Sequence, residues 1–220
     1  MKEMKFVTPL HTRTSRDYVA RVVENDKAEC AEVACQFGKD YWDGDRKYGY
    51  GGYRYDGRWS VVAQAMIDHY QLGPHSSILD VGCGKAFLLY EFKKLLPQAT
   101  VVGVDISQYG LDNAKEEMRP FLQLADATEL PFENQSFDLV ISLGALHNLP
   151  INRLVAALRE LERVKKGNAY MMVEAYRNER EKVNLLYWQL TCKSFYHHDD
   201  WIWLFEEYGY NGDYEFIYFE

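Results

Sequence analysis

Between residues 76 and 175, short apolar runs alternate with longer segments whose apolar residues recur every three or four positions. The short runs predict buried strands, and apolar residues at helical spacing predict helices that pack on a sheet. Strands are predicted at 78–81, 101–105, 121–125, 137–143 and 169–175, with a last strand at 213–220. Helices are predicted at 88–96, 107–118 and 151–161. This alternation favours an α/β fold built on a mostly parallel sheet.

Helical spacing also occurs on both sides of this region. A helix is predicted from the cap residue Asp26 to about Gly38, and a second at 59–70 before the break at Gly73-Pro74. After the fifth strand, helices are predicted at 178–190 and 201–208. We expect the polar segment 12–17 to be mobile. The chain therefore divides into an N-terminal arm with helices, residues 1–75, and the core, residues 76–220.

Residues 41–59 differ in composition from the rest of the chain, because five glycines and seven aromatic residues alternate with charges. Glycine at this density disfavours a regular helix. One interpretation is an ordered loop whose tyrosines cover the edge of the core. The other is a lid over a ligand, in which aromatic rings face a cation and Arg54 or Arg58 pairs with a carboxylate. Both interpretations can hold together.

A glycine turn follows the first strand, in the sequence Asp80-Val-Gly-Cys-Gly84. Glycine allows a tight turn and close approach of a ligand, and the N-terminus of the next helix offers free N–H groups to nucleotide-like ligands. A dinucleotide fingerprint needs a third glycine where Phe87 stands, which disfavours a nicotinamide oxidoreductase. Asp105 follows about 20 residues later, where a ribose-binding carboxylate is expected.

Four segments in order resemble motifs of the class I S-adenosylmethionine (SAM)-dependent methyltransferases, between about Ser76 and Glu174. They are Ile78–Gly84, Val101–Ser107, Leu124–Phe132 and Ser136–Ser142. The resemblance implies a Rossmann-like doubly wound sheet with helices on both faces, SAM as methyl donor and S-adenosylhomocysteine as product. It also implies that the segment before the first strand closes over the cofactor. Ala86 stands where many members have a third glycine, and we expect only a modest change in loop shape.

The resemblance and the strand ends together predict two sets of site residues. The cofactor set is Asp80, Gly82, Cys83, Gly84, Asp105, Ile106, Asp126, Ala127, Leu143 and Arg58. The acceptor set is Tyr48, Tyr50, Tyr53, Tyr55, Trp59, His147, Asn148, Glu174, Tyr176 and Arg177. His147 either takes a proton from the acceptor or is a structural residue of its loop. Asp126 is otherwise a surface turn, and Glu174, Tyr176 and Arg177 otherwise form a salt-bridged edge.

The composition limits which partners and which cellular compartment we expect for the protein. The net charge of −8 argues against nucleic acid, whose binding needs a basic face. The absence of a run of 18 apolar residues argues against a membrane span. Four cysteines without a Cys-x-x-Cys pair predict reduced thiols and a cytoplasmic location. His197 and His198 are adjacent and would point to opposite faces of a strand, so no metal is predicted.

These observations predict a methyltransferase that acts by in-line displacement on O or N of a small molecule, sugar-linked metabolites included. A protein side chain is the second acceptor class. The competing class is a SAM-binding subunit without chemistry that activates a partner. The family usually ends in two antiparallel strands, and only one is clear here. An open sheet edge would make a homodimer plausible.

Overall fold

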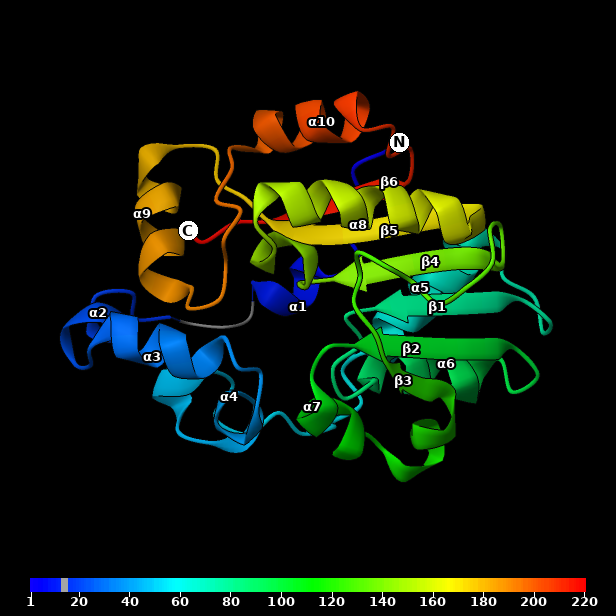
Figure 1. Cartoon of the computed structure of the whole chain (residues 1–220), viewed down its shortest axis with the longest axis horizontal. Coiled ribbons are helices and arrows are strands. Elements are labelled where there is room, and N and C mark those ends of the chain that lie inside the picture. Colours follow the sequence, from blue (N-terminus) through cyan, green and yellow to red (C-terminus); the bar gives the residue numbers. More distant parts are fainter. Residues whose placement is uncertain (13–15) are drawn as a thin grey trace.

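The structure is a computed structural model that describes residues 1–12 and 16–220, so half of the segment predicted to be mobile, residues 13–15, lies outside the described residues. A six-stranded sheet in the order β3-β2-β1-β4-β5-β6 forms its centre (Figure 1). The strands are β1 (Ser77–Val81), β2 (Thr100–Asp105), β3 (Leu122–Leu124), β4 (Phe137–Leu143), β5 (Lys165–Glu174) and β6 (Asp213–Ile217). All neighbouring strands are parallel, which confirms the predicted α/β fold.

Helices cover both faces of the sheet because its central strands are apolar on both sides. On one face, α5 (Ser60–Tyr70) and α6 (Phe87–Leu95) pack with Ile78 in one hydrophobic cluster. On the other face, α8 (Ile151–Val164) and α10 (His198–Glu207) pack with Leu79 in a second cluster. Full burial of each such side chain contributes about 1.5–3 kcal/mol. The two clusters fix the sheet in the middle of the molecule.

Two helices begin where their capping residues predict. The Asp26 carboxylate accepts hydrogen bonds from the N–H groups of Ala28 (2.8 Å) and Glu29 (3.1 Å), and α3 (Lys27–Ala34) follows. Asn178 caps α9 (Glu179–Trp188) in the same way. The shorter helical elements are α1 (Thr8–His11), α2 (Ala20–Val23), α4 (Lys39–Asp43), η1 (Arg46–Tyr48) and η3 (Leu146–Asn148).

The single helix predicted at 107–118 is wrong. Ser107 does cap α7 (Gln108–Asp112), with its Oγ accepting from the Gly110 N–H at 2.9 Å. The helix ends at Asn113, whose side-chain amide donates to the Tyr109 carbonyl at 2.9 Å and so competes with the helical hydrogen bonds. A separate 3₁₀ element, η2 (Glu116–Phe121), follows.

The end of the sheet also differs from the antiparallel pair that is usual in the family. β6 runs parallel to β5, because the 38 residues between them, which carry α9 and α10, form a crossover. The outer edge of β6 meets the N-terminal arm: Tyr214 N–H donates to the Lys2 carbonyl (3.0 Å), and Met4 N–H donates to the Tyr214 carbonyl (2.7 Å). The sheet edge that was expected to be open is thus partly paired with the N-terminal arm. The homodimer stays a prediction, and an open edge no longer supports it.

A buried carboxylate fastens the same arm to the sheet. Glu215 on β6 is 1% exposed, and it accepts hydrogen bonds from the N–H groups of Phe6 (2.7 Å) and Val7 (3.0 Å). It also accepts from the N–H and hydroxyl of Thr8 and from the Tyr170 hydroxyl at 2.6 Å. The carboxylate therefore meets the start of α1, where its negative charge is favoured by the free N–H groups of the helix.

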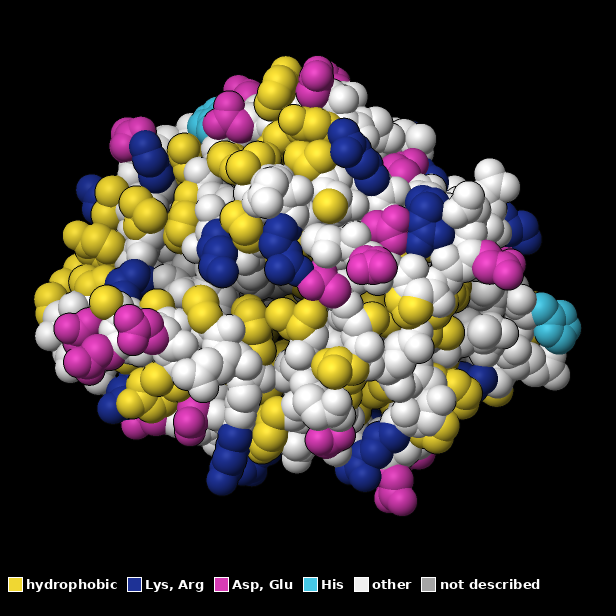
Figure 2. Space-filling view, viewed as in Figure 1, with side chains coloured by type: hydrophobic (Ala, Val, Ile, Leu, Met, Phe, Trp, Pro, Cys, Tyr) yellow, Lys and Arg dark blue, Asp and Glu magenta, His cyan; other side chains and the backbone are white. Residues whose placement is uncertain are grey.

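The surface in Figure 2 carries acidic and basic side chains side by side, with hydrophobic side chains gathered over α10 at the top. In the part of the chain that the structure describes, no helix is both long and apolar enough to cross a bilayer. All four cysteines are free thiols. The cytoplasmic location stays a prediction.

Candidate functional site

A cavity of about 190 Å³ lies at the carboxyl ends of β1, β4 and β5, the side of the sheet that faces α4 in Figure 1. In an open α/β sheet, ligands bind at this edge. One side, the strand wall, consists of Asp80, Gly82, Gly84, Leu143 and Glu174. The other side, the aromatic wall, consists of Tyr41, Trp42, Tyr50, Tyr53 and Trp59. The cavity therefore joins residues predicted for the cofactor to residues predicted for the acceptor.

The glycine turn has no room for side chains. Gly82 has φ +82° and Gly84 has φ +53°, which favours glycine at both positions. A Cβ on Gly82 would clash with the Ala145 side chain, and one on Gly84 would lie 2.6 Å from the ring of Trp42. Ala86 adopts φ +56°, so it keeps the left-handed conformation of the missing third glycine at a cost of about 1–2 kcal/mol.

Asp80 and Asp105 are two buried carboxylates next to this turn. The Asp105 carboxylate accepts from the Gly84 N–H and the Ser107 N–H, both at 2.7 Å, and so holds the turn in place. Burial raises the pKa of both aspartates, and the charge of Asp105 contributes to raising that of Asp80 to about 8. Asp80 lines the cavity, whereas Asp105 does not. A cationic ligand group beside Asp80 would stabilise its charged form.

His147 and Glu174 meet at the base of the cavity. Nε2 of His147 lies 3.4 Å from Oε2 of Glu174, and the Gln189 side chain donates to the other Glu174 oxygen. Burial lowers the pKa of His147 to about 3 and raises that of Glu174 to about 8. Among the described residues, no hydrogen-bond partner reaches Nδ1 of His147, Oδ1 of Asn148 or Oε2 of Glu174. Buried polar atoms of this kind are rare and cost free energy unless a ligand meets them.

The aromatic wall is attached to the sheet through side chains. Trp42 Nε1 donates to Ser107 Oγ at 2.8 Å, and its ring stacks on Tyr50 with centroids 5.3 Å apart. Buried Lys85 bridges Asp43, at 2.7 Å, and the Tyr53 carbonyl, at 2.9 Å. The wall is thus ordered over the glycine turn, as both interpretations of residues 41–59 require.

Four of the ten residues in the predicted acceptor set lie outside this cavity. Tyr55 donates to the Glu91 carboxylate on α6, and Arg177 is bound by Glu181 and Glu220. Tyr48 and Tyr176 also do not line the cavity. The contacts of Arg177 fit the salt-bridged edge that was the alternative. Tyr50, Tyr53, Trp59, His147, Asn148 and Glu174 do line the cavity.

The predicted cofactor set divides in the same way. Asp80, Gly82, Cys83, Gly84 and Leu143 line the cavity. Ile106 is 54% exposed, and Ala127 lies outside the cavity. Asp126 accepts from the Thr128 N–H at 2.9 Å and pairs with Arg153, as a surface turn would. Arg58 pairs with Asp56 at 2.5 Å. The roles assigned to these outlying residues stay predictions.

Several cavity residues were missing from the predicted sets. Tyr41 and Trp42 belong to the aromatic stretch, so their composition was a usable signal. Phe87 and Leu88 follow the glycine turn closely. Gln189 and Thr191 line the cavity from the segment after α9, where no sequence pattern marks them.

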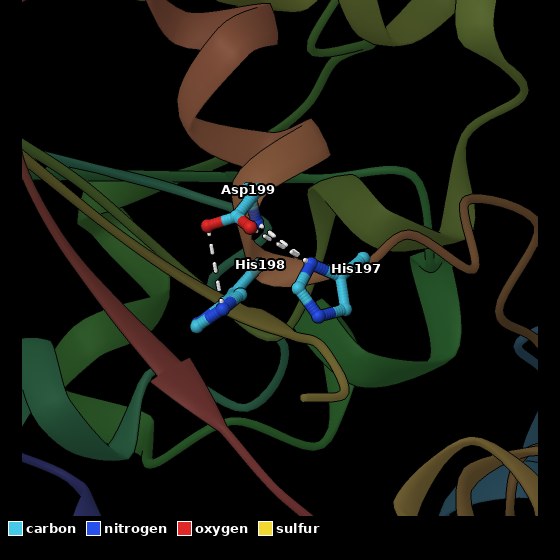
Figure 3. Close-up of side chains that lie close together, drawn as sticks. All are labelled: His197, His198 and Asp199. Atoms are coloured by element: carbon cyan, nitrogen blue, oxygen red, sulfur yellow. Dashed lines mark hydrogen bonds and ion pairs between the residues drawn. The ribbon is translucent and has the colours of Figure 1, made fainter. Parts of the chain in front are cut away.

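A group outside this cavity has the residue types of a metal site. His197 caps α10 and His198 begins it, so the two are not on a strand and do not point to opposite faces. Their ring centroids are 4.4 Å apart, and the Asp199 carboxylate lies beside both rings, with one oxygen 3.4 Å from Nδ1 of His197 and the other 3.3 Å from Nε2 of His198 (Figure 3). The geometric reason for predicting no metal is wrong. His197 also contacts the Arg177 carbonyl and His198 the Tyr218 hydroxyl, and the prediction itself stays untested.

A parallel sheet in this strand order, with a glycine turn after β1, is a Rossmann-like fold. Residues 78–168 match the family model described as a methyltransferase domain. Residues 78–168 therefore carry a methyltransferase domain, as the resemblance implied.

Characterised relatives differ in acceptor. The chain is 36% identical over 99 residues to malonyl-[acyl-carrier protein] O-methyltransferase of Legionella pneumophila, covering 43% of this chain and 34% of that protein. It is 31% identical over 128 residues to demethylmenaquinone methyltransferase of Symbiobacterium thermophilum, covering 54% and 50%. It is 32% identical over 130 residues to tRNA (carboxymethyluridine(34)-5-O)-methyltransferase of Arabidopsis thaliana, covering 59% and 30%.

The chain thus spans about a third to a half of the length of these relatives. Among solved structures, the YcgJ protein from Bacillus subtilis is similar with a TM-score of 0.55 and 22% identity over 66% of each chain, which shows the fold. Because one relative is a tRNA methyltransferase, the exclusion of nucleic acid stays a prediction.

Proposed function

We propose that the protein transfers a methyl group from SAM to an oxygen or nitrogen of a small molecule. The observation that carries this proposal is the cavity itself. It brings the glycine turn and Asp80 together with three buried polar atoms, on His147, Asn148 and Glu174, that the described residues leave without hydrogen bonds. Such atoms fit an acceptor that donates and accepts hydrogen bonds beside the methyl donor.

The residues of the strand wall fit the donor end of the cavity. SAM supplies a methyl group already activated on a positively charged sulfur, and it carries an α-ammonium group. Asp80 is a buried carboxylate whose pKa is raised to about 8, and no described residue forms an ion pair with it. Cationic groups would lower that pKa toward its ordinary value. Gly82 and Gly84 leave the main chain open to the ligand.

Positioning is the main task of the other residues. In-line displacement requires the acceptor atom, the methyl carbon and the sulfur to align, and alignment can contribute roughly 7–11 kcal/mol to catalysis. The aromatic wall limits the space available to the acceptor, and the Asn148 side chain can fix the orientation of the acceptor by a hydrogen bond. The cavity of about 190 Å³ leaves room beside the methyl donor only for the reacting part of an acceptor, which fits a small molecule.

A hydroxyl or ammonium acceptor must also lose a proton. We infer that this proton passes to Glu174, because a pKa near 8 is close to the operating pH of most enzymes. His147, whose pKa is lowered to about 3, stays neutral and lies beside the carboxylate, with its Nε2 3.4 Å from Oε2 of Glu174. If His147 is the base instead, as the sequence suggested, His147→Ala removes turnover while Glu174→Gln retains it.

The first test of the function is calorimetric titration with S-adenosylhomocysteine and, separately, with NAD. We expect micromolar binding of the first, none of the second, and at least tenfold weaker binding by Asp105→Ala, because Asp105 holds the Gly84 N–H. Asp68→Ala, an exposed position on α5, serves as the control. Binding of NAD, or no binding of S-adenosylhomocysteine with and without cell metabolites, would contradict the proposal.

A SAM-binding subunit without chemistry is the second candidate. It is supported by exposed apolar side chains on two helices that contact each other: Val19 and Val23 at α2, and Val183 and Leu186 on α9. Such a surface can accept a partner. Transfer of labelled methyl from SAM to any acceptor in a metabolite extract would exclude this candidate.

A further inference from the structure

A second cavity of about 450 Å³ adjoins the first and is rich in arginine. The two share six lining residues, among them Tyr50, Glu174 and Gln189, so they meet at the predicted acceptor position. Five of the chain's 12 arginines line the second cavity: Arg16, Arg21, Arg46, Arg54 and Arg58. We call it the arginine pocket.

This positive charge contrasts with the rest of the molecule. The chain has a net charge of −8, yet Glu174 is the only acidic residue among the described residues that line the arginine pocket. Arginine concentrated in one concave site is the usual means of recognising an oxyanion, because its planar guanidinium matches phosphate and carboxylate oxygens.

Three of the arginines converge on a single indole ring. The guanidinium carbons of Arg16, Arg21 and Arg46 lie 5.4, 5.3 and 5.2 Å from the centre of the Trp188 ring. Arg21 also donates to the Arg46 carbonyl at 2.8 Å. Burial lowers the pKa of Arg16 and of Arg21, and the nearby charge of Arg46 lowers both further. Like charges held this close are stabilised by an anion between them.

The chain supplies few counter-charges here. Among the described residues, no carboxylate forms an ion pair with Arg21, Arg46 or Arg54, whereas Arg58 pairs with Asp56 at 2.5 Å. Arginines elsewhere in the fold, such as Arg163 with Glu160, do have acidic partners. The arginine pocket thus keeps a local excess of positive charge beside the acceptor position.

We infer that the arginine pocket binds a phosphate or carboxylate group of the acceptor, and that this anchor presents the acceptor's hydroxyl or amine to Glu174. The inference rests on the proposed function and narrows its substrate class to anionic small molecules. In the reaction, a bond forms between the acceptor oxygen or nitrogen and the methyl carbon. The carbon–sulfur bond breaks with its electron pair going to sulfur, and the acceptor proton passes to the Glu174 carboxylate.

The test uses pyrophosphate and citrate as probes, titrated by calorimetry into the protein saturated with S-adenosylhomocysteine. We expect at least one probe to bind, and Arg46→Gln/Arg54→Gln to weaken that binding at least tenfold. Arg159 is exposed, and its guanidinium lies over the ring of Tyr208, the C-cap residue of α10. Arg159→Gln should leave the binding of the probe unchanged. Binding of pyrophosphate alone assigns the anchor to phosphate, and binding of citrate alone assigns it to carboxylate.

Four outcomes overturn the inference. Three concern the probes: binding of neither probe to the parent protein, equal binding by the double variant, and equal weakening by Arg159→Gln. Loss of S-adenosylhomocysteine binding in the folded double variant would also overturn it, because the arginines would then hold the cofactor carboxylate. Failure of the proposed function gives a different result, because the parent protein would then not bind S-adenosylhomocysteine. In that case the probes are titrated into the protein without S-adenosylhomocysteine. Matching circular dichroism spectra show that the variants are folded.

Discussion

The two walls of the first cavity are held in different ways. The strand wall consists of residues at strand ends, and main-chain hydrogen bonds fix their positions, as in the bonds from the Gly82 and Cys83 N–H groups to the Val104 carbonyl (2.8 and 3.0 Å). The aromatic wall depends on ring stacking and on a few side-chain bonds, such as Trp42 to Ser107. The sheet therefore sets the geometry of the cofactor end, whereas residues at the acceptor end can be exchanged without disturbing the sheet.

Removing the central ring of the aromatic wall should have the largest effect. Trp42 is 7% exposed, and replacing a buried tryptophan with alanine costs about 3–5 kcal/mol. Because the wall is attached through side chains, we expect Trp42→Ala to open residues 37–55 locally. Hydrogen exchange should then speed up in that segment while amides of β1 and β4 remain protected.

Trp203→Ala is the matched control, since Trp203 on α10 is 57% exposed and its loss should change little. Equal loss of protection in β1 and β4 would show that the two walls unfold together. The two walls would then differ in geometry but not in local stability.

Glu174 of the strand wall lowers the free energy of unfolding as the pH rises. Burial raises the pKa of Glu174 from its usual 4.5 to about 8, so between these values the unfolded chain releases a proton that the folded chain retains. Stability attributable to Glu174 is therefore full below pH 4.5 and falls as the pH rises to 8. Glu174→Gln should remove this fall, which amounts to about 3–4 kcal/mol between pH 5 and 8, in denaturant unfolding followed at several pH values.

Glu160→Gln is a control of opposite sign. A hydrogen bond from Arg163 lowers the pKa of Glu160, so its carboxylate stabilises the fold above its unfolded pKa, and the substitution should lose stability at neutral pH. If Glu174→Gln followed the same pH profile as the parent protein, Glu174 would not be the strained carboxylate of the strand wall.

The smallest effect is expected at Ala86. Its φ of +56° is unfavourable for alanine but free of strain for glycine, while glycine adds entropy to the unfolded chain. These contributions oppose each other, so Ala86→Gly should change the unfolding free energy by less than about 1 kcal/mol. The affinity for S-adenosylhomocysteine should stay within twofold. A larger loss of either would show that the Ala86 methyl group, which is fully buried, contributes packing to the turn.

Features that depend on neighbouring residues were predictable from the sequence. Apolar periodicity predicted the six strands, and local capping chemistry predicted where the helices after Asp26 and Asn178 begin. The glycine turn with Asp80 was predictable because its conformation is set within five residues. Asn113, by contrast, ends a helix through a side-chain hydrogen bond that competes with the periodic pattern around it.

Features that depend on distant segments could not be predicted in this way. Gln189 and Thr191 reach the cavity only because the segment after α9 returns to the ends of β4 and β5. The direction of β6 depends on how its crossover packs. The arginine pocket gathers Arg16, Arg46 and Arg54 around Trp188 and Glu174, residues separated by more than 100 positions. No pattern within a short window contains that information.

The attachment of the arm through Glu215 has a consequence for biosynthesis. Phe6, Val7 and Thr8 leave the ribosome early, but the carboxylate that binds them lies more than 200 positions later in the chain. During translation Phe6, Val7 and Thr8 therefore have no native partner until Glu215 has emerged from the ribosome. Contacts between such distant positions form slowly, because the intervening chain must be ordered first. The arm should accordingly be the last segment to fold, and protease added during refolding should cleave it before it reaches the sheet.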